Sequence, residues 1–198
     1  MKYIFLVITC ISLFATSSSY GQAKRDFVPF INQSHPWVER TFQQLTPRER
    51  IAQLLLIRAH TDRGTRYIYS VGRIVRQEKL GGLVVFHGGP VRHAEMFNRY
   101  QEDSKVPLLI TFDGEWGLGM RLADSTTSYP YQMTLGAIQR DELIYDMGKQ
   151  VAKDFLRLGM HFNFAPVVDI NNNPQNPVIN FRSFGDNKEN VTRKAKAY

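Results

Sequence analysis

The richest chemical stretch of the sequence is TFDGEWGLGMRL, at positions 111–122. It holds two carboxylates, Asp113 and Glu115, together with Trp116, three glycines and Arg121. A carboxylate accepts hydrogen bonds from two neighbouring hydroxyl groups, an arginine donates a fork of hydrogen bonds, and an aromatic ring covers an apolar face. These residue types indicate a site for a hydroxyl-rich ligand such as a sugar.

Each of these residues also has a structural interpretation. Asp113 can cap the next segment, Trp116 can fill the core, and Arg121 can pair with a surface carboxylate. For the glycines we expect a close approach of the backbone to a ligand, because a glycine has no side chain in the way. The combination of types in one loop favours the ligand site.

A second polar segment covers residues 171–187 and is rich in Asn and Pro, which predicts a long, shaped loop. Arg182 lies in it between Phe181 and the Ser183-Phe184 pair, which can hold its guanidinium in one orientation. Either Arg182 binds a ligand, or it is a structural arginine bonded to loop carbonyls. We expect Asp169, at the end of a predicted strand, to orient neighbours such as Arg182.

Other chemistries lack their sequence patterns. No histidine pair has H-x-x-x-H or H-E-x-x-H spacing, so we expect no metal and no cofactor; the histidines considered are His60, His87, His93 and His161. The G-x-S-x-G motif of serine hydrolases is missing, as are nucleotide-binding glycine loops. The only cysteine is Cys10, near the start of the chain.

The elements that must position these loops alternate along the chain. Thr46, Pro47 and Glu49 form the signature of a helix start with a capping box, and residues 51–57 are apolar enough to continue into a buried strand. Hydrophobic patterns predict helices over residues 70–79, 91–104 and 140–158 and from 188 onward, and strands over 80–86, 107–112 and 162–170. Gly159 is expected to end the longest helix.

Continuous apolar strands separated by helices predict a parallel sheet buried on both faces. Polar loops after the strands are typical of (β/α)8 barrels and of doubly wound sheets. A barrel needs eight units and about 250 residues, whereas this chain carries roughly four units. The alternatives are a smaller open sheet or the first half of a TIM-type (β/α)8 barrel. We favour the half-barrel, because the helix from 188 has no visible end.

The N-terminus has the layout of a secretory signal peptide over residues 1–23. Lys2 precedes an apolar run from Ile4 to Ala15, and small polar residues follow, with cleavage expected after Gly21 or Ala23. The run is shorter than the roughly 20 residues that span a bilayer, so no integral membrane span is expected. The sequence thus predicts an exported protein, periplasmic or extracellular, with an irregular lead-in over 24–36.

The net charge of +7 raises the possibility of nucleic-acid binding. Lysines and arginines are scattered, however, and the densest group is at Arg193, Lys194 and Lys196. No finger spacing or aromatic-basic motif accompanies them. We expect a solvated basic surface and no nucleic-acid partner.

From Trp37 to Tyr198 the chain resembles the N-terminal domain of glycoside hydrolase family 3. The resemblance rests on LTPRERIAQLL, LGGLVVF, PLLITFDGEWGLGMR, YPYQMTLGA, NFAPVVDI and NPVINFRSFGD, which occur in the family's order. The D-x-E-x-G form, with an arginine eight positions after the aspartate, is similar to the β-N-acetylglucosaminidase branch. The β-glucosidase branch usually has a histidine-glycine pair in that loop.

The resemblance implies that Asp113, Arg121 and Arg182 bind the terminal sugar and that Glu115 supports the loop. It implies a retaining hydrolase that removes terminal β-linked N-acetylglucosamine, with cell-wall fragments as a candidate substrate, without a metal or cofactor. The family's lysine-histidine pair, its acid histidine and its aspartate nucleophile follow the R-S-F arginine and do not occur before Tyr198. We therefore assign no catalytic residue here and expect this chain to bind sugar weakly and hydrolyse nothing.

Three other interpretations stay open. A β-glucosidase or β-xylosidase of the same family would act on a different sugar. A non-catalytic exported sugar-binding protein would fold and bind sugar within these residues. An exported scaffold or interaction module would bind no sugar, and the sequence indicates no oligomeric state.

Overall fold

The computed structural model describes residues 33–198. The predicted signal peptide and most of the predicted lead-in lie outside the described residues. The chain divides into two units after Glu39, and the fold below is that of the second, Arg40–Tyr198. The first helix, α2 (Pro36–Gln43), begins at the end of the expected lead-in and was not predicted.

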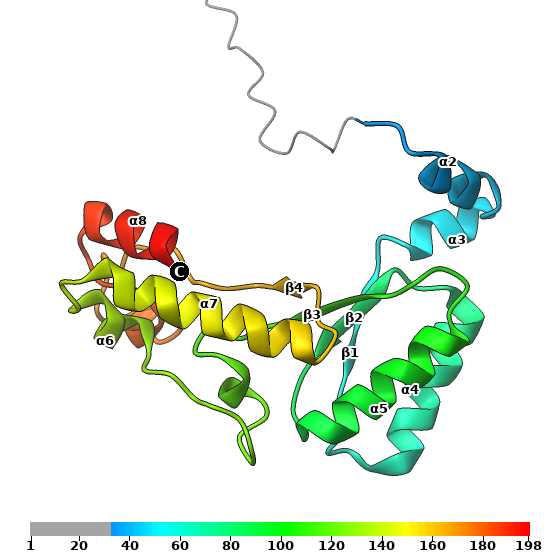
Figure 1. The fold of residues 1–198 in the computed structure, drawn as a ribbon, viewed down its shortest axis with the longest axis horizontal. Coiled ribbons are helices and arrows are strands. Elements are labelled where there is room, and N and C mark those ends of the chain that lie inside the picture. The colour runs from blue at the N-terminus through cyan, green and yellow to red at the C-terminus, as the bar shows by residue number, and fades with distance from the viewer. Residues whose placement is uncertain (1–32) are drawn as a thin grey trace, which may run out of the picture. The chain divides into compact units, whose positions relative to one another are not determined.

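The second unit alternates helices and strands (Figure 1). Its four strands are β1 (Leu56–Ala59), β2 (Gly82–Val85), β3 (Leu109–Phe112) and β4 (Phe162–Asn163). The helices are α3 (Pro47–Ala52), α4 (Gly64–Glu78), α5 (Pro90–Asp103), α6 (Gln132–Gly136), α7 (Asp141–Arg157) and α8 (Lys188–Ala197), with 3-10 turns η1 (Leu118–Met120) and η2 (Asn180–Arg182). The strands pair in chain order and all are parallel.

One face of this sheet is buried under helices. Ala59, Val85 and Phe112 point to that face and are fully buried. They pack in one core with residues of α4, α5 and α7, including Val71, Val75, Met96, Phe97, Tyr100, Val151 and Phe155. Burial of this apolar surface is the main force that holds the sheet and its helices together.

The opposite face of the sheet is largely open, which the sequence pattern did not predict. Leu56 pairs with Gly82, and Gly82 pairs with Leu109, so the side chains of both leucines point to the same face. Leu56 is 39% exposed, Leu109 44% and Phe162 50%. A parallel α/β sheet with helices on one face only is the arrangement of the first units of a (β/α)8 barrel, whose inner face carries no helices. The predicted α/β class and half-barrel architecture are confirmed.

The strands are shorter than predicted, and the difference is clearest at two places. The predicted strand over 162–170 pairs only through Phe162 and Asn163, because β3 ends at Phe112 and offers no partner further along. In the apolar run over 51–57, Leu54 and Leu55 are 80% and 51% exposed in the connection between α3 and β1. The prediction from apolar residues was therefore wrong about the length of these strands and about the burial of Leu54 and Leu55.

Several predicted helix termini agree closely with the structure, whereas α4 begins at Gly64, well before the predicted start at residue 70. The Thr46 side chain accepts from the Glu49 amide, and the Glu49 side chain accepts from the Thr46 amide, so the predicted capping box is present. The longest helix, α7, ends just before Gly159, which has the left-handed φ of +71°. The apolar residues Ile144, Met147, Val151 and Phe155 of α7 are buried, whereas Leu143 is 47% exposed.

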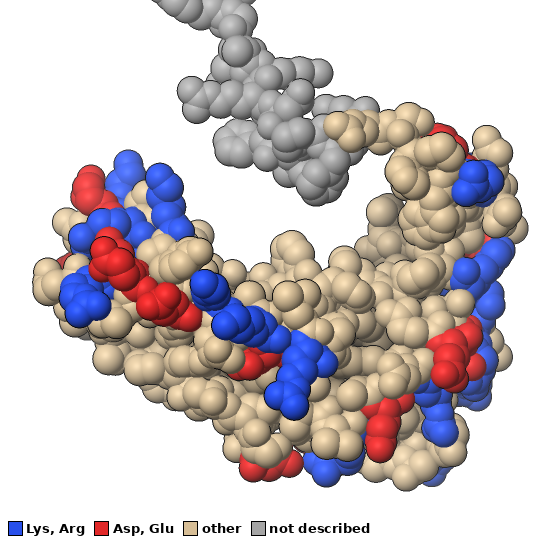
Figure 2. Space-filling model, viewed as in Figure 1, with Lys and Arg blue, Asp and Glu red and all other residues tan. Residues whose placement is uncertain are grey.

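Charge on the surface is mixed in sign. Figure 2 shows Lys and Arg side chains interspersed with Asp and Glu on the visible face. The part of the chain that the structure describes also contains no helix with the length and apolarity to cross a membrane. The expected solvated basic surface is compatible with this mixed pattern.

The capping box predicts a pH-dependent contribution to stability. The Thr46 amide and Lys105 Nζ, 3.0 Å away, donate to the Glu49 carboxylate and lower its pKa from 4.5 to about 2. Because the folded pKa is depressed, this contribution is fully present above about pH 4.5 and is lost as the pH falls toward 2. We expect Glu49→Gln to lower the melting temperature at pH 7, with the difference from wild type disappearing near pH 2.

The matched control is Glu102→Gln, which alters an exposed carboxylate of α5. Thermal unfolding followed by circular dichroism at several pH values measures both variants. A difference for Glu49→Gln that stays constant from pH 7 to pH 2 would show that the carboxylate charge contributes nothing.

Candidate functional site

The loop after β3 begins with Asp113 and brings it close to Arg121. The Asp113 Oδ2 and Arg121 Nη2 atoms lie 3.6 Å apart, with the side chains 33% and 19% exposed. The Arg121 guanidinium also lies over the Phe86 ring, 4.7 Å from its centroid, and Phe86 directly follows β2. Two adjacent strand ends therefore set the position of this pair.

The Asp113–Arg121 pair retains hydrogen-bonding capacity. At 3.6 Å the two groups attract each other but are too far apart for a normal hydrogen bond. The buried Nε of Arg121 has no hydrogen-bond partner within the described residues. A ligand with hydroxyl groups could therefore accept from Arg121 and donate to Asp113 without breaking an existing hydrogen bond.

Arg182 is held by Glu115, not by loop carbonyls alone. Its Nε lies 3.0 Å from both Glu115 oxygens, and its Nη2 donates to Oε1 at 2.7 Å. Its Nη1 donates to the carbonyl of Val178 at 3.1 Å. The Glu115 hydrogen bonds, and less strongly the charges of Asp113 and Asp169, raise the pKa of Arg182. Glu115 is 3% exposed, so this is a charge-assisted bidentate pair at the edge of the core.

The expectation that Asp169 orients Arg182 was wrong in its main point. Glu115 makes the direct contacts, and the charge of Asp169 adds only a smaller attraction. The backbone carbonyl of Asp169 instead accepts from the Ser183 hydroxyl at 2.6 Å. Asp169 thus positions the backbone next to Arg182, while its own side chain is exposed.

The backbone around Arg182 is anchored by its C-terminal neighbours. Ser183 is fully buried, and Phe184 is 1% exposed in a second apolar cluster with Leu135, Ile144 and Val191. The three cluster partners of Phe184 come from α6, α7 and α8, which lie together in Figure 1. Because Phe184 is packed in this cluster, the backbone at Arg182 is held in the position from which its side chain contacts Glu115.

Aromatic rings connect the same two segments. Trp116 meets Tyr131 edge to face with centroids 4.6 Å apart, and Tyr131 meets Phe181 at 4.6 Å. Tyr131 and Phe181 are 45% and 46% exposed. The sequence left open whether Trp116 packs in the core or stacks on a sugar ring. It did not indicate Tyr131, because the contacts of Tyr131 with Trp116 and Phe181 join segments that are far apart in sequence.

The glycines of the first loop serve the fold of the loop. Gly117 has φ +83°, a conformation that side chains rarely adopt. A Cβ at Gly119 would lie 2.7–2.8 Å from backbone atoms of Ser128, because the Gly119 amide donates to the Thr127 carbonyl at 3.1 Å. The left-handed φ of Gly117 and the close contact of Gly119 with Ser128 thus give both glycines a structural role, and the expected approach to a ligand stays a prediction.

Two residues outside the predicted set tether the loop start. The Asn163 side chain accepts from the Gly114 amide at 2.9 Å, and the Tyr198 hydroxyl donates to the Gly114 carbonyl at 3.0 Å. Burial raises the pKa of Tyr198 to about 12, so its hydroxyl stays protonated and able to donate at neutral pH. No sequence motif marked either contact, since each joins distant segments.

The structure therefore brings the three predicted residues to one edge of the sheet. Asp113 faces Arg121 directly and contributes to the field at Arg182. All three side chains are partly exposed, at 33%, 19% and 32%. Their role in binding a sugar remains a prediction, while their proximity is a feature of the fold.

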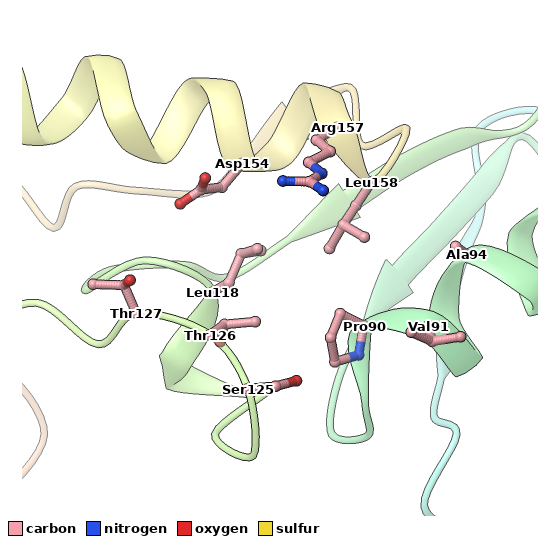
Figure 3. A pocket seen from close by; sticks show the side chains of 10 residues that line it. All are labelled: Pro90, Val91, Ala94, Leu118, Ser125, Thr126, Thr127, Asp154, Arg157 and Leu158. Atoms are coloured by element: carbon pink, nitrogen blue, oxygen red, sulfur yellow. The ribbon is translucent and has the colours of Figure 1, made fainter.

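A separate cavity of about 500 Å³ lies between the start of α5, the segment around η1 and the end of α7 (Figure 3). Leu118 and Leu158 line it together with Asp154 and Arg157. None of the three predicted residues contributes to this cavity. Asp154 accepts from the Gln150 side chain at 3.0 Å within α7.

Comparison with protein families gives one match that covers most of the chain. Residues 46–198 match the model of the glycosyl hydrolase family 3 N-terminal domain. The matched region includes both loops described above and every strand of the sheet.

Curated relatives named beta-hexosaminidases match over most of this chain but over a minor part of their own length. Beta-hexosaminidase A of Pseudoalteromonas piscicida is 32% identical over 135 residues, which are 62% of this chain and 23% of the relative. Beta-hexosaminidase LpqI of Mycobacterium tuberculosis is 28% identical over 160 residues, 78% of this chain and 39% of the relative. The chain thus spans less than a quarter of the first relative and about two fifths of the second.

Solved structures show the same relationship. A family 3 β-N-acetylglucosaminidase from Paenibacillus sp. is similar with a TM-score of 0.69 and 32% identity, over 77% of this chain and 30% of the other. The beta-glucoside phosphorylase BglX is similar with a TM-score of 0.74 and 27% identity, over 82% of this chain and 29% of the other.

The buried Glu115 carboxylate predicts a test of the Arg182 contact. Glu115→Gln keeps the shape of the side chain but removes its charge and replaces one acceptor oxygen by a donor group. We expect the free energy of unfolding to fall by about 2–3 kcal/mol, because hydrogen bonds between charged groups are lost in a nearly dry place. Chemical denaturation measures this change.

A suitable control is Glu142→Gln, which alters an exposed carboxylate at the start of α7. It should change the free energy of unfolding by less than about 0.5 kcal/mol. Equal stabilities for Glu115→Gln and wild type would mean that the Glu115–Arg182 contact does not hold the two loops together.

Proposed function

The chain belongs to glycosyl hydrolase family 3, through the N-terminal domain of that family, and from this premise we propose that it forms the terminal-sugar site of a β-N-acetylglucosaminidase. In this proposal Asp113, Arg121 and Arg182 bind one terminal β-linked N-acetylglucosamine. The ligand is a carbohydrate, and binding needs neither a metal nor a cofactor.

The observation that carries the proposal is the unsatisfied pair at the end of β3. The buried Nε of Arg121 has no partner in the described part of the chain, and the Nη2 atom of Arg121 lies 3.6 Å from Asp113 Oδ2. A pyranose offers adjacent hydroxyl groups that can accept from one and donate to the other. Arg182, held by Glu115, has a side chain that is still 32% exposed and can contribute a further contact.

The choice of N-acetylglucosamine is supported by the names of the relatives. Several curated relatives are beta-hexosaminidases, and one solved neighbour is named a β-N-acetylglucosaminidase. The D-x-E-x-G loop with Arg121 agrees with that branch of the family. We infer a retaining hydrolysis of the O-glycosyl bond for the protein that contains this chain.

Asp113 and Glu115 are not assigned to the bond-breaking step. A retaining glycosidase needs a nucleophile and an acid/base group on either side of the scissile bond. Glu115 is committed to Arg182 and nearly inaccessible, while Asp113 belongs to the binding pair. We assign catalysis to groups outside these 198 residues and expect the chain alone to bind sugar weakly without hydrolysing it.

The place of action that we propose is outside the cytoplasm, either the periplasm or the extracellular space. Residues 1–23, with Lys2 and the apolar run from Ile4 to Ala15, support export. Cell-wall fragments carrying terminal N-acetylglucosamine are a substrate class compatible with that location.

A β-glucoside is the second candidate substrate, favoured by the likeness to the beta-glucoside phosphorylase BglX. Initial rates of the active protein that contains this chain separate the possibilities. They are measured on aryl N-acetylglucosaminide and on aryl glucoside, each with and without inorganic phosphate. The proposal predicts a higher kcat/KM for the N-acetylglucosaminide and no dependence on phosphate. Preference for the glucoside, or a requirement for phosphate, would overturn it.

Replacement of Asp113 by Ala tests the binding role in the active protein that contains this chain. Two hydrogen bonds to sugar hydroxyls are lost, each contributing about 1–3 kcal/mol when the acceptor is charged. We expect kcat/KM on an aryl N-acetylglucosaminide to fall by at least about 30-fold.

The control is Asp124→Ala, which removes an exposed carboxylate that lies 3.8 Å from Arg92. It should leave the kinetics within about twofold of wild type, because a well-exposed ion pair contributes little. Kinetics of Asp113→Ala that equal those of this control would refute the assignment of Asp113 to sugar binding.

A further inference from the structure

A second group of ligating side chains lies at the ends of β1 and β2. His60 directly follows β1, and His87 lies two residues after β2. The strands are paired with Ala59 beside Val85, so the residues that follow them are neighbours in space. Ligand atoms of His60, Asp62 and His87 all lie within 4.8 Å of one another.

No sequence motif connects these residues. His60 and His87 belong to different strands, and their separation matches no metal-binding motif. Parallel strand pairing places the two segments side by side, a relationship that spacing along one helix or loop does not reveal. The expectation that no metal binds was based on local spacing alone.

The His60 ring is a buried polar group without a partner. It is 2% exposed, and neither ring nitrogen has a hydrogen-bond partner among the described residues. Buried polar atoms are almost always satisfied in proteins, and leaving one unpaired is unfavourable. The site is thus incomplete at an imidazole nitrogen, which is a common metal ligand.

Aromatic neighbours hold the His60 ring in place. Phe86 stacks on it with centroids 5.2 Å apart and an interplanar angle of 24°. Tyr67 meets it edge to face at 5.7 Å. A ligand ring whose orientation is already fixed loses little conformational freedom when it binds an ion.

The separation of His60 and Asp62 suits a small tetrahedral ion. His60 Nδ1 and Asp62 Oδ1 lie 3.5 Å apart, at the upper limit of a hydrogen bond. A tetrahedral Zn²⁺ ion with bonds of about 2.0–2.2 Å holds its ligand atoms roughly 3.4 Å apart. His87 and Asp62 are exposed, so both side chains can rotate toward the ion.

We propose that His60, Asp62 and His87 bind one divalent transition-metal ion of the Zn²⁺ class, with a fourth position open to solvent or another ligand. Two imidazoles and one carboxylate suit Zn²⁺, Co²⁺ and Ni²⁺ far better than Ca²⁺ or Mg²⁺, which need oxygen ligands. Arg58 and Arg63 carry positive charge near His60, which further disfavours ions that are held by charge alone.

Such an ion would fasten the loop after β1 to the loop after β2. Phe86 stacks on His60 and also contacts the Arg121 guanidinium, at 4.7 Å. The metal site therefore shares a structural residue with the pair at the end of β3. The inference goes beyond the proposed sugar site and does not rest on it, since sugar binding requires no metal.

Titration with Co²⁺ tests the site, because tetrahedral Co²⁺ bound by nitrogen and oxygen ligands absorbs visible light. The chain is dialysed against a chelator and then against metal-free buffer before Co²⁺ is added, and Zn²⁺ binding is measured by calorimetry. We expect one equivalent of either metal to bind. His87→Gln and Asp62→Asn, which each change an exposed ligand, should weaken metal binding by at least about tenfold.

The control variant is His35→Gln, which changes a histidine outside the second unit whose Nδ1 accepts from the Trp37 amide. It should bind both metals like wild type, and circular dichroism of all variants checks that the fold is kept. Failure of the wild type to bind a stoichiometric metal ion would overturn the proposal. So would unchanged binding by His87→Gln and Asp62→Asn, or an equal loss in His35→Gln.

Discussion

The contact between Glu115 and Arg182 is the interaction on which the candidate site depends. It joins side chains that are 67 residues apart in sequence, through three short nitrogen–oxygen distances. One partner is nearly inaccessible to water, so the pair is satisfied only when both loops adopt the observed arrangement. The position of Arg182 relative to Asp113 and Arg121 follows from this contact.

Supporting contacts surround the pair on both sides. Trp116, Tyr131 and Phe181 connect the same loops through apolar surface, and Phe184 anchors the second loop in the cluster of α6, α7 and α8. Asn163 fixes the start of the first loop. Polar and apolar contacts thus restrain the same geometry, as the proposed sugar site requires.

The sheet shows how one architecture serves both folding and site construction. Helices bury one face, while the other face presents Leu56, Leu109 and Phe162. All four strands run parallel, so their C-terminal ends meet at one edge. Asp113 lies at that edge, and so do His60 and His87, because each follows the end of a strand in this shared direction.

Local structure and the chemical character of the loops could be predicted from the amino-acid sequence alone. Capping residues at Thr46 and Glu49, the apolar face of α7 and Gly159 act over a few residues, so their effects are readable from the order of the side chains. The loop motifs also predicted Asp113, Arg121 and Arg182 as sugar-binding residues, a role that stays a prediction. The folded structure was needed to show that Glu115, not Asp169, holds Arg182 and that His60 lies beside His87. It also decided where strands end, because pairing and burial depend on partners far away along the chain.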